Sequence, residues 1–220
     1  MLPMIRTMVI DDEALVRTGF ELILGQDPEI EVVATADDRT ALDQIERHRP
    51  DVVLLDIRMP HIDGLTILRE TLRRDEPPAV AILTTFDADE YVVEALRLGA
   101  SGFLLKDTDP RQLATLVKTL AAGGVVLSPR VTRSVISGFV ASSAVAASVT
   151  AVAKLTERER TVLAHASVGL SNREIADLIQ HSIGTVKDDM SAVLAKLGVA
   201  TRVQAALIAQ QAGVIDGESP

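Results

Sequence analysis

Short apolar runs alternate with longer amphipathic stretches along the first half of the chain. The runs cover residues 8–10, 31–34, 52–55, 80–83 and 102–105. The amphipathic stretches cover residues 14–25, 38–47, 65–74, 90–98 and 110–122. Strand-length runs that alternate with helical stretches are typical of a parallel sheet with helices on both faces. The pattern therefore predicts a doubly wound α/β domain of five strand-then-helix units, (βα)5, in residues 1–127.

The pattern changes after residue 127. Residues 128–153 contain few charged side chains, and alanine, serine and valine dominate from residue 139, so we expect a linker with a short helix near its start. Helical periodicity returns in residues 154–216, where we expect an all-α domain of four short helices. These helices cover residues 156–168, 171–179, 182–197 and 201–212.

Local residues mark the starts of these helices and the way they are joined. Three pairs match the capping box, in which two side chains satisfy free N–H groups reciprocally. The pairs are Thr156 with Glu159, Ser171 with Glu174, and Thr201 with Gln204. The second and third helices are joined by only a few residues, Gln180 and His181 among them, which predicts a helix-turn-helix layout.

Polar side chains stand where the apolar runs of the first domain end. Asp11 and Asp12 follow the first run, Asp56 follows the third, and Thr84 and Lys106 follow the last two. Because the carboxyl ends of parallel strands meet at one edge of a sheet, these side chains would share a site. Carboxylates suit Mg²⁺, and one of them could accept a phosphoryl group as an acyl phosphate. An aspartate at a strand end can also cap the next helix, but that reading does not account for the whole set.

Composition excludes several classes of protein. The chain has no cysteine, so disulfides, thiolate metal sites and cysteine nucleophiles are excluded. The start lacks a signal-peptide pattern and no apolar stretch is long enough to span a bilayer, so we expect a cytoplasmic protein without a membrane partner. The net charge of −9 alone argues against a dedicated nucleic-acid binder. From residue 154 onward, however, seven basic residues nearly balance eight acidic ones.

Residues 5–125 resemble the receiver domain of two-component response regulators. The resemblance is carried by the acidic residues, the turn from Met59 to Gly64, and the pair Thr84 and Lys106. It implies that Asp56 is the phosphoacceptor, that Thr84 and Lys106 sense the phosphoryl group, and that Phe103 is an aromatic switch. It also implies a Mg²⁺ site made by Asp11, Asp12, Asp56 and the backbone carbonyl of Arg58. His61 stands where this subfamily often has glycine, and we expect the exposed turn to tolerate it.

The same resemblance implies a sensor histidine kinase as the phosphoryl donor. Phosphorylation adds a charge of about −1.5 to −2 at one point. Movement of Thr84 and Lys106 toward that charge would repack the surface around residues 91–98 and Phe103. We therefore expect residues 90–98 and 110–122 to form the surface through which two phosphorylated copies dimerise.

Residues 155–215 resemble the LuxR/NarL-type DNA-binding domain. The matching segments are residues 155–159, 169–176, 184–187 and 194–199. The resemblance implies that the third helix enters the major groove of double-stranded promoter DNA. Candidate DNA contacts are Thr185, Lys187, Asp188, Ser191 and Lys196. Lys196 has an alternative role at the C-terminus of its own helix.

Two acidic residues in the third helix depart from that family. Asp188 and Asp189 follow Lys187, where the family commonly has an uncharged residue and then histidine. Carboxylates repel phosphates and would weaken nonspecific affinity. Two explanations are open. Asp188 accepts a hydrogen bond from cytosine N4, or the domain binds DNA weakly, or only as a phosphorylated dimer with help from elsewhere.

These observations predict a phosphorylation-controlled transcriptional regulator and not an enzyme. An alternative is a regulator that acts mainly through protein contacts, with weakened DNA binding. A more remote alternative is a Mg²⁺-dependent phosphohydrolase that uses Asp56 as nucleophile. The phosphohydrolase is disfavoured because no second catalytic acid or base stands near Asp56 in the sequence.

Overall fold

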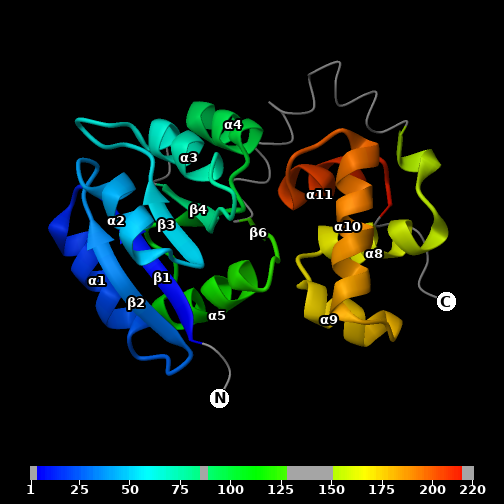
Figure 1. Cartoon of the computed structure of the whole chain (residues 1–220), viewed down its shortest axis with the longest axis horizontal. Helices are drawn as coiled ribbons and strands as arrows, with labels where there is room; N and C mark the ends of the chain where they lie inside the picture. Colours follow the sequence, from blue (N-terminus) through cyan, green and yellow to red (C-terminus); the bar gives the residue numbers. More distant parts are fainter. Residues whose placement is uncertain (1–3, 85–88, 128–150, 215–220) are drawn as a thin grey trace.

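The computed structural model of the chain describes residues 4–84, 89–127 and 151–214. In the first part, six parallel strands form one sheet in the order β2-β1-β3-β4-β5-β6 (Figure 1). The strands are β1 (Ile5–Ile10), β2 (Ile30–Ala36), β3 (Val52–Asp56), β4 (Ala79–Thr84), β5 (Gly102–Leu105) and β6 (Val126–Leu127). The helices between them are α1 (Ala14–Leu24), α2 (Ala41–His48), α3 (Gly64–Leu72), α4 (Asp89–Leu98) and α5 (Pro110–Ala121).

Alternate residues of each strand pack on opposite faces of the sheet. Met8 and Ile10 belong to a buried cluster with residues of α2, α3 and α4, whereas Val9 packs with residues of α1 and α5. Both faces are therefore covered by helices, as Figure 1 shows. This arrangement confirms the predicted doubly wound fold, because strands buried on both faces must be apolar on both.

The register of the strands brings their carboxyl ends together. Ile10 pairs with Leu55, and Thr84 pairs with Leu105, so the residues that follow these strands lie along the same edge. The short strand β6 next to β5 was not expected. Two residues carry no recognisable periodicity, which explains why the pattern of the sequence did not reveal it.

The second part of the chain is an all-α domain, as predicted. A short 3₁₀ turn, η1 (Val152–Lys154), precedes α8 (Glu157–Ser167), α9 (Asn172–Ile179), α10 (Ile183–Leu197) and α11 (Arg202–Gln211). All three predicted capping boxes form, at the starts of α8, α9 and α11. The expected helix between the two domains lies in residues 128–150, outside the described residues.

Helix α11 packs against the first domain as well as its own. Val203 and Leu207 are buried in the cluster that contains Leu96 of α4. The side-chain amide of Gln204 donates a hydrogen bond to the backbone oxygen of Leu96, with a distance of 2.7 Å. This contact joins residues 108 positions apart in the sequence. One helix of the C-terminal domain thus rests on the last turns of α4.

Arg202 makes a second connection between the domains. Its guanidinium donates one hydrogen bond to the backbone oxygen of Gly123, at 3.0 Å, and another to the side-chain oxygen of Asn172, at 2.7 Å. Burial lowers the pKa of Arg202 to about 10. The charge of this residue is therefore held inside the interdomain contact by hydrogen bonds with both domains.

Within the described ranges, no single helix is both long and apolar enough to cross a membrane. Helices α10 and α11 reach the required length only as a pair, and the pair is bent by 66° at its break.

Candidate phosphoryl site and nucleic-acid interface

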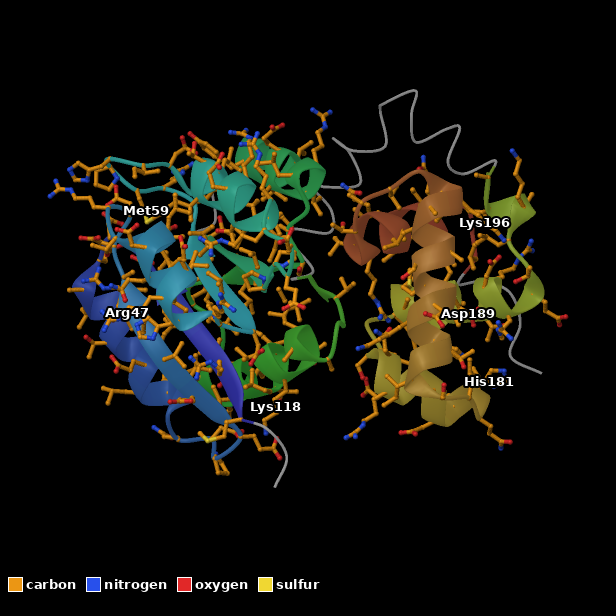
Figure 2. All side chains as sticks on the ribbon, viewed as in Figure 1. Arg47, Met59, Lys118, His181, Asp189 and Lys196 are labelled. Carbon is orange, nitrogen blue, oxygen red and sulfur yellow. The ribbon has the colours of Figure 1, made fainter. Side chains whose placement is uncertain are left out.

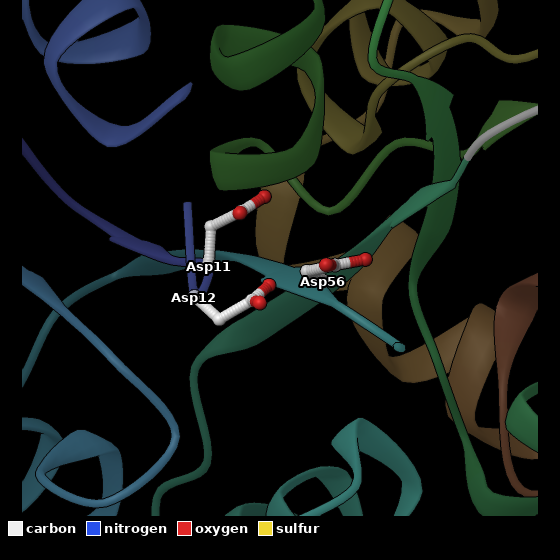
Figure 3. Close-up of side chains that lie close together, drawn as sticks. All are labelled: Asp11, Asp12 and Asp56. Atoms are coloured by element: carbon white, nitrogen blue, oxygen red, sulfur yellow. The ribbon is translucent and has the colours of Figure 1, made fainter. Parts of the chain in front are cut away.

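Three carboxylates meet at the edge of the sheet where β1 and β3 end. One oxygen each from Asp11, Asp12 and Asp56 lies within 4.8 Å of the others (Figure 3). Asp11 and Asp56 are buried, and Asp12 is exposed. Asp11 Oδ2 is fully buried. A hard cation fits such a set, because carboxylate oxygens are the ligands it prefers and one oxygen of each of the three acids is within reach of a single ion.

Lys106 lies between two of these carboxylates. Its Nζ donates a hydrogen bond to Asp56 Oδ2 at 2.9 Å and forms an ion pair with Asp11 Oδ2 at 2.8 Å. Glu13 lies farther away, 3.7 Å from Nζ. The structure thus brings the lysine that ends β5 to the acidic residues that end β1 and β3. One positive charge partly offsets three negative ones.

Burial and this pairing shift the pKa values of both Asp56 and Lys106. Burial raises the pKa of Asp56, and the hydrogen bond from Lys106 only partly opposes that effect. Burial lowers the pKa of Lys106, but its contacts with Asp11 and Asp56 outweigh burial and leave the pKa raised. Lys106 is therefore cationic at neutral pH.

Thr84 and Phe103 lie on the next two strands of the sheet, β4 and β5. Thr84 is buried at the end of β4, and its backbone oxygen accepts a hydrogen bond from Lys106 N at 3.0 Å. Phe103 is fully buried in the cluster under α4. Thr84 is thus bonded through its backbone to Lys106, and Phe103 shares a buried cluster with residues of α4.

Arg58 links the pocket to α4 by another route. Its backbone N–H donates to Asp56 Oδ1 at 3.3 Å. Its guanidinium lies over the ring of Tyr91, 5.6 Å from the centroid. This contact was not anticipated from the sequence. The only available signal was a cation two residues after Asp56, together with the single tyrosine of the chain.

The turn after β3 is tightly fitted to Asp56. A Cβ atom on Gly64 would lie 2.3 Å from the backbone oxygen of Asp56 and 2.7 Å from Ile57 Cα. His61, predicted to be an exposed turn residue, is exposed but anchored. Its backbone N–H donates to Asp38 Oδ2 at 2.7 Å, and its ring lies near the same carboxylate. Glycine at position 64 therefore allows the turn to close against the pocket.

Helix α10 presents most of the predicted DNA contacts. Ser182 caps it and accepts a hydrogen bond from Thr185 N at 3.0 Å. Lys187, Asp188 and Ser191 are exposed on this helix, and Thr185 is half-buried. The Thr185 hydroxyl is hydrogen-bonded to Ser182 Oγ, and that of Ser191 donates to the backbone oxygen of Lys187. Lys187 and Asp188 therefore carry the exposed charge of this surface.

Two other charged residues of α10, Asp189 and Lys196, which Figure 2 labels, are paired with residues of α8. Asp189 is buried and accepts hydrogen bonds from Arg158 with both oxygens, at 2.7 and 2.8 Å. Lys196 donates to both oxygens of Glu159, at 2.7 and 2.6 Å. These pairs hold α10 against α8. Arg158 thereby compensates the charge of Asp189, and the DNA contact of Lys196 stays a prediction.

Comparison with known proteins decides the family. Residues 7–118 match the response regulator receiver domain, and residues 153–209 match the bacterial regulatory proteins of the LuxR family. The chain is a response regulator of the LuxR-type family. The resemblance drawn from the sequence is thereby confirmed for both halves of the protein.

Relatives of this response regulator extend over nearly its whole length. It is 36% identical to the DNA-binding transcriptional activator DevR/DosR of Mycobacterium tuberculosis over 94% of this chain and 95% of that protein. It is also 36% identical to the transcriptional regulatory protein DegU of Brevibacillus brevis, over 91% of each chain. Among solved structures, the response regulator ChrA of a haem-sensing two-component system is 35% identical, with a TM-score of 0.54 and coverage of 97% and 100%.

The tight turn of this response regulator yields a prediction. Gly64→Ala is expected to destabilise the receiver domain by about 1–3 kcal/mol, because the added methyl group overlaps backbone that cannot move freely. Urea unfolding followed by circular dichroism measures this change. The matched control is Gly19→Ala in α1, where a Cβ would meet nothing within 4 Å. Equal unfolding midpoints for the two variants would contradict the account of this turn.

Proposed function

We propose that this response regulator accepts a phosphoryl group on Asp56 from a partner histidine kinase and then binds promoter DNA as a homodimer. The observation that carries the proposal is the position of Lys106 between Asp56 and Asp11. A carboxylate that ends a strand beside a lysine and two more acids can attack phosphorus and hold the product. The bond to the donor breaks, and the leaving group keeps its electron pair.

The receiver site also fits Mg²⁺. Asp11, Asp12 and Asp56 would hold the ion, together with the backbone carbonyl of Arg58 as the family implies. When bound, Mg²⁺ offsets the charge of the incoming phosphoryl group and orients it. Lys106 would exchange part of its bonding with the carboxylates for the phosphoryl oxygens, and Thr84 would donate its hydroxyl to them. The group is then kept as a signal and is not turned over.

The contact between α4 and α11 supports a route from the phosphoryl group to the DNA-binding domain. Tyr91, in the first turn of α4, lies under Arg58, and Leu96, near its end, accepts the hydrogen bond from Gln204. Repacking of α4 would disturb both contacts. Release of α11 would also uncover α4, which belongs to the predicted dimer surface. Two copies would then present two α10 helices to adjacent half-sites of DNA. We expect this to occur in the cytoplasm, where the proposed DNA partner lies.

Phosphoryl transfer to Asp56 is tested by mass spectrometry of the intact protein. Acetyl phosphate with Mg²⁺ should add the mass of one phosphoryl group to the wild type, and a chelator should prevent the addition. Asp56→Asn should gain no mass, because an amide is a poor nucleophile. Asp75→Asn, at an exposed aspartate after α3, should be labelled like the wild type. Full labelling of Asp56→Asn would sink the assignment.

The role of the interdomain contact is tested with Gln204→Glu. Glutamate keeps the acceptor that caps α11 through Ala200 N and Thr201 N. It loses the amide donor to Leu96 and should weaken the contact by about 1–3 kcal/mol. Small-angle scattering of the unphosphorylated variant should show a larger radius of gyration than that of the wild type. Gln210→Glu, at the exposed end of α11, makes the same change of charge and should leave the radius unaltered. An unaltered radius in both variants would show that the contact does not depend on this bond.

A further inference from the structure

The outward face of α10 is a narrow stripe with one positive and one negative side chain. The stripe consists of Gly184, Lys187, Asp188, Ser191 and Ala195, all exposed. The opposite face consists of Val186, Met190, Val193 and Leu197, all buried in the core of the domain. Spacings of three and four residues keep each set on one side of a helix. Whatever lies against α10 from outside therefore meets Lys187 and Asp188.

The two adjacent acids of α10 have different surroundings. Asp189 is 7% exposed, and Arg158 compensates its charge with two hydrogen bonds. Asp188 is exposed, and its carboxylate has neither a hydrogen bond nor an ion pair in the part of the chain that the structure describes. One carboxylate, and not two, thus faces a bound duplex. The repulsion expected from an acidic pair is reduced to that of a single group beside Lys187.

Small residues surround Asp188 along the stripe. Its neighbours one turn away are Gly184 and Ala192, and Ser191 has its hydroxyl bonded back to the helix. Aspartate has a short side chain, so its oxygens reach a base only if the helix backbone comes close to the groove floor. Small neighbours allow that approach, whereas long side chains would hold the helix away.

The chemistry of a carboxylate limits which base it can bind. It only accepts hydrogen bonds, and the donors on the floor of the major groove are the amino groups of cytosine and adenine. Adenine presents the N7 acceptor next to its amino group, which would repel the second carboxylate oxygen. Cytosine presents N4 without an adjacent acceptor of its own, so it matches an aspartate better.

We propose that Asp188 determines sequence specificity by accepting a hydrogen bond from the N4 amino group of one cytosine in each half-site. The inference rests on the proposed function, because it requires α10 to lie in a major groove. Lys187 supplies the neighbouring positive charge that offsets repulsion between Asp188 and the phosphates. Repulsion between the carboxylate and the phosphates lowers affinity for all duplexes. The hydrogen bond from cytosine restores affinity for duplexes that carry cytosine at the right position.

The test is selection of binding sites from random duplex DNA by the full-length protein treated with acetyl phosphate and Mg²⁺. The wild type should select a C·G pair at one position of each half-site. Asp188→Ala should lose about tenfold discrimination in favour of C·G at that position and keep the base preferences at the other positions. Asp188→Asn should change the preference from cytosine to adenine, because an amide donates to N7 while it accepts from N6. Asp177→Ala, which removes an exposed acid from α9, should leave the selected sequence unchanged.

Two other outcomes would overturn the inference in distinguishable ways. If Asp188→Ala selects the same sequence as the wild type and binds all duplexes more tightly by one factor, Asp188 only repels phosphate. The proposed function would survive that result. If the phosphorylated wild type selects no sequence at all, the proposed function fails and the inference fails with it.

Discussion

Two carboxylates are buried opposite each other at one edge of the receiver sheet, and the ammonium group of Lys106 between them offsets their repulsion. Without that charge, burial of Asp11 and Asp56 together would be strongly unfavourable. The compensation is incomplete, since Asp12 adds a third negative charge at the rim. The site is therefore suited to a cation, and Lys106 is shared between groups that compete for it. A phosphoryl group on Asp56 would change that competition, and the same lysine is bonded through its backbone to Thr84.

Helix α4 connects the acidic site of the receiver domain to the second domain. One end of the helix contacts Arg58, which follows Asp56 by two residues, and the other end supports Gln204 of α11. The outward face of α10 is exposed while α11 is buried in the contact. In this arrangement, phosphorylation would control how two copies dimerise, and not whether α10 is accessible to DNA.

The sequence predicted those features that depend on local order along the chain. Runs that end in Asp11, Asp56 and Lys106 indicate a shared edge once the strands are parallel, and capping pairs such as Ser171 with Glu174 indicate where helices begin. Contacts between distant residues were not predictable in this way. The partner of Asp189 is one example, because Arg158 lies 31 positions away on another helix. The bond from Gln204 to Leu96 crosses from one domain to the other, so no periodicity within either domain reveals it.

In the proposed function, a phosphoryl group on Asp56 governs DNA binding by α10. The most direct measurement is the affinity of the full-length protein for its selected duplex, before and after treatment with acetyl phosphate and Mg²⁺. Treatment should raise the affinity of the wild type and leave that of Asp56→Asn unchanged. An equal rise in both proteins, or no rise in the wild type, would contradict it.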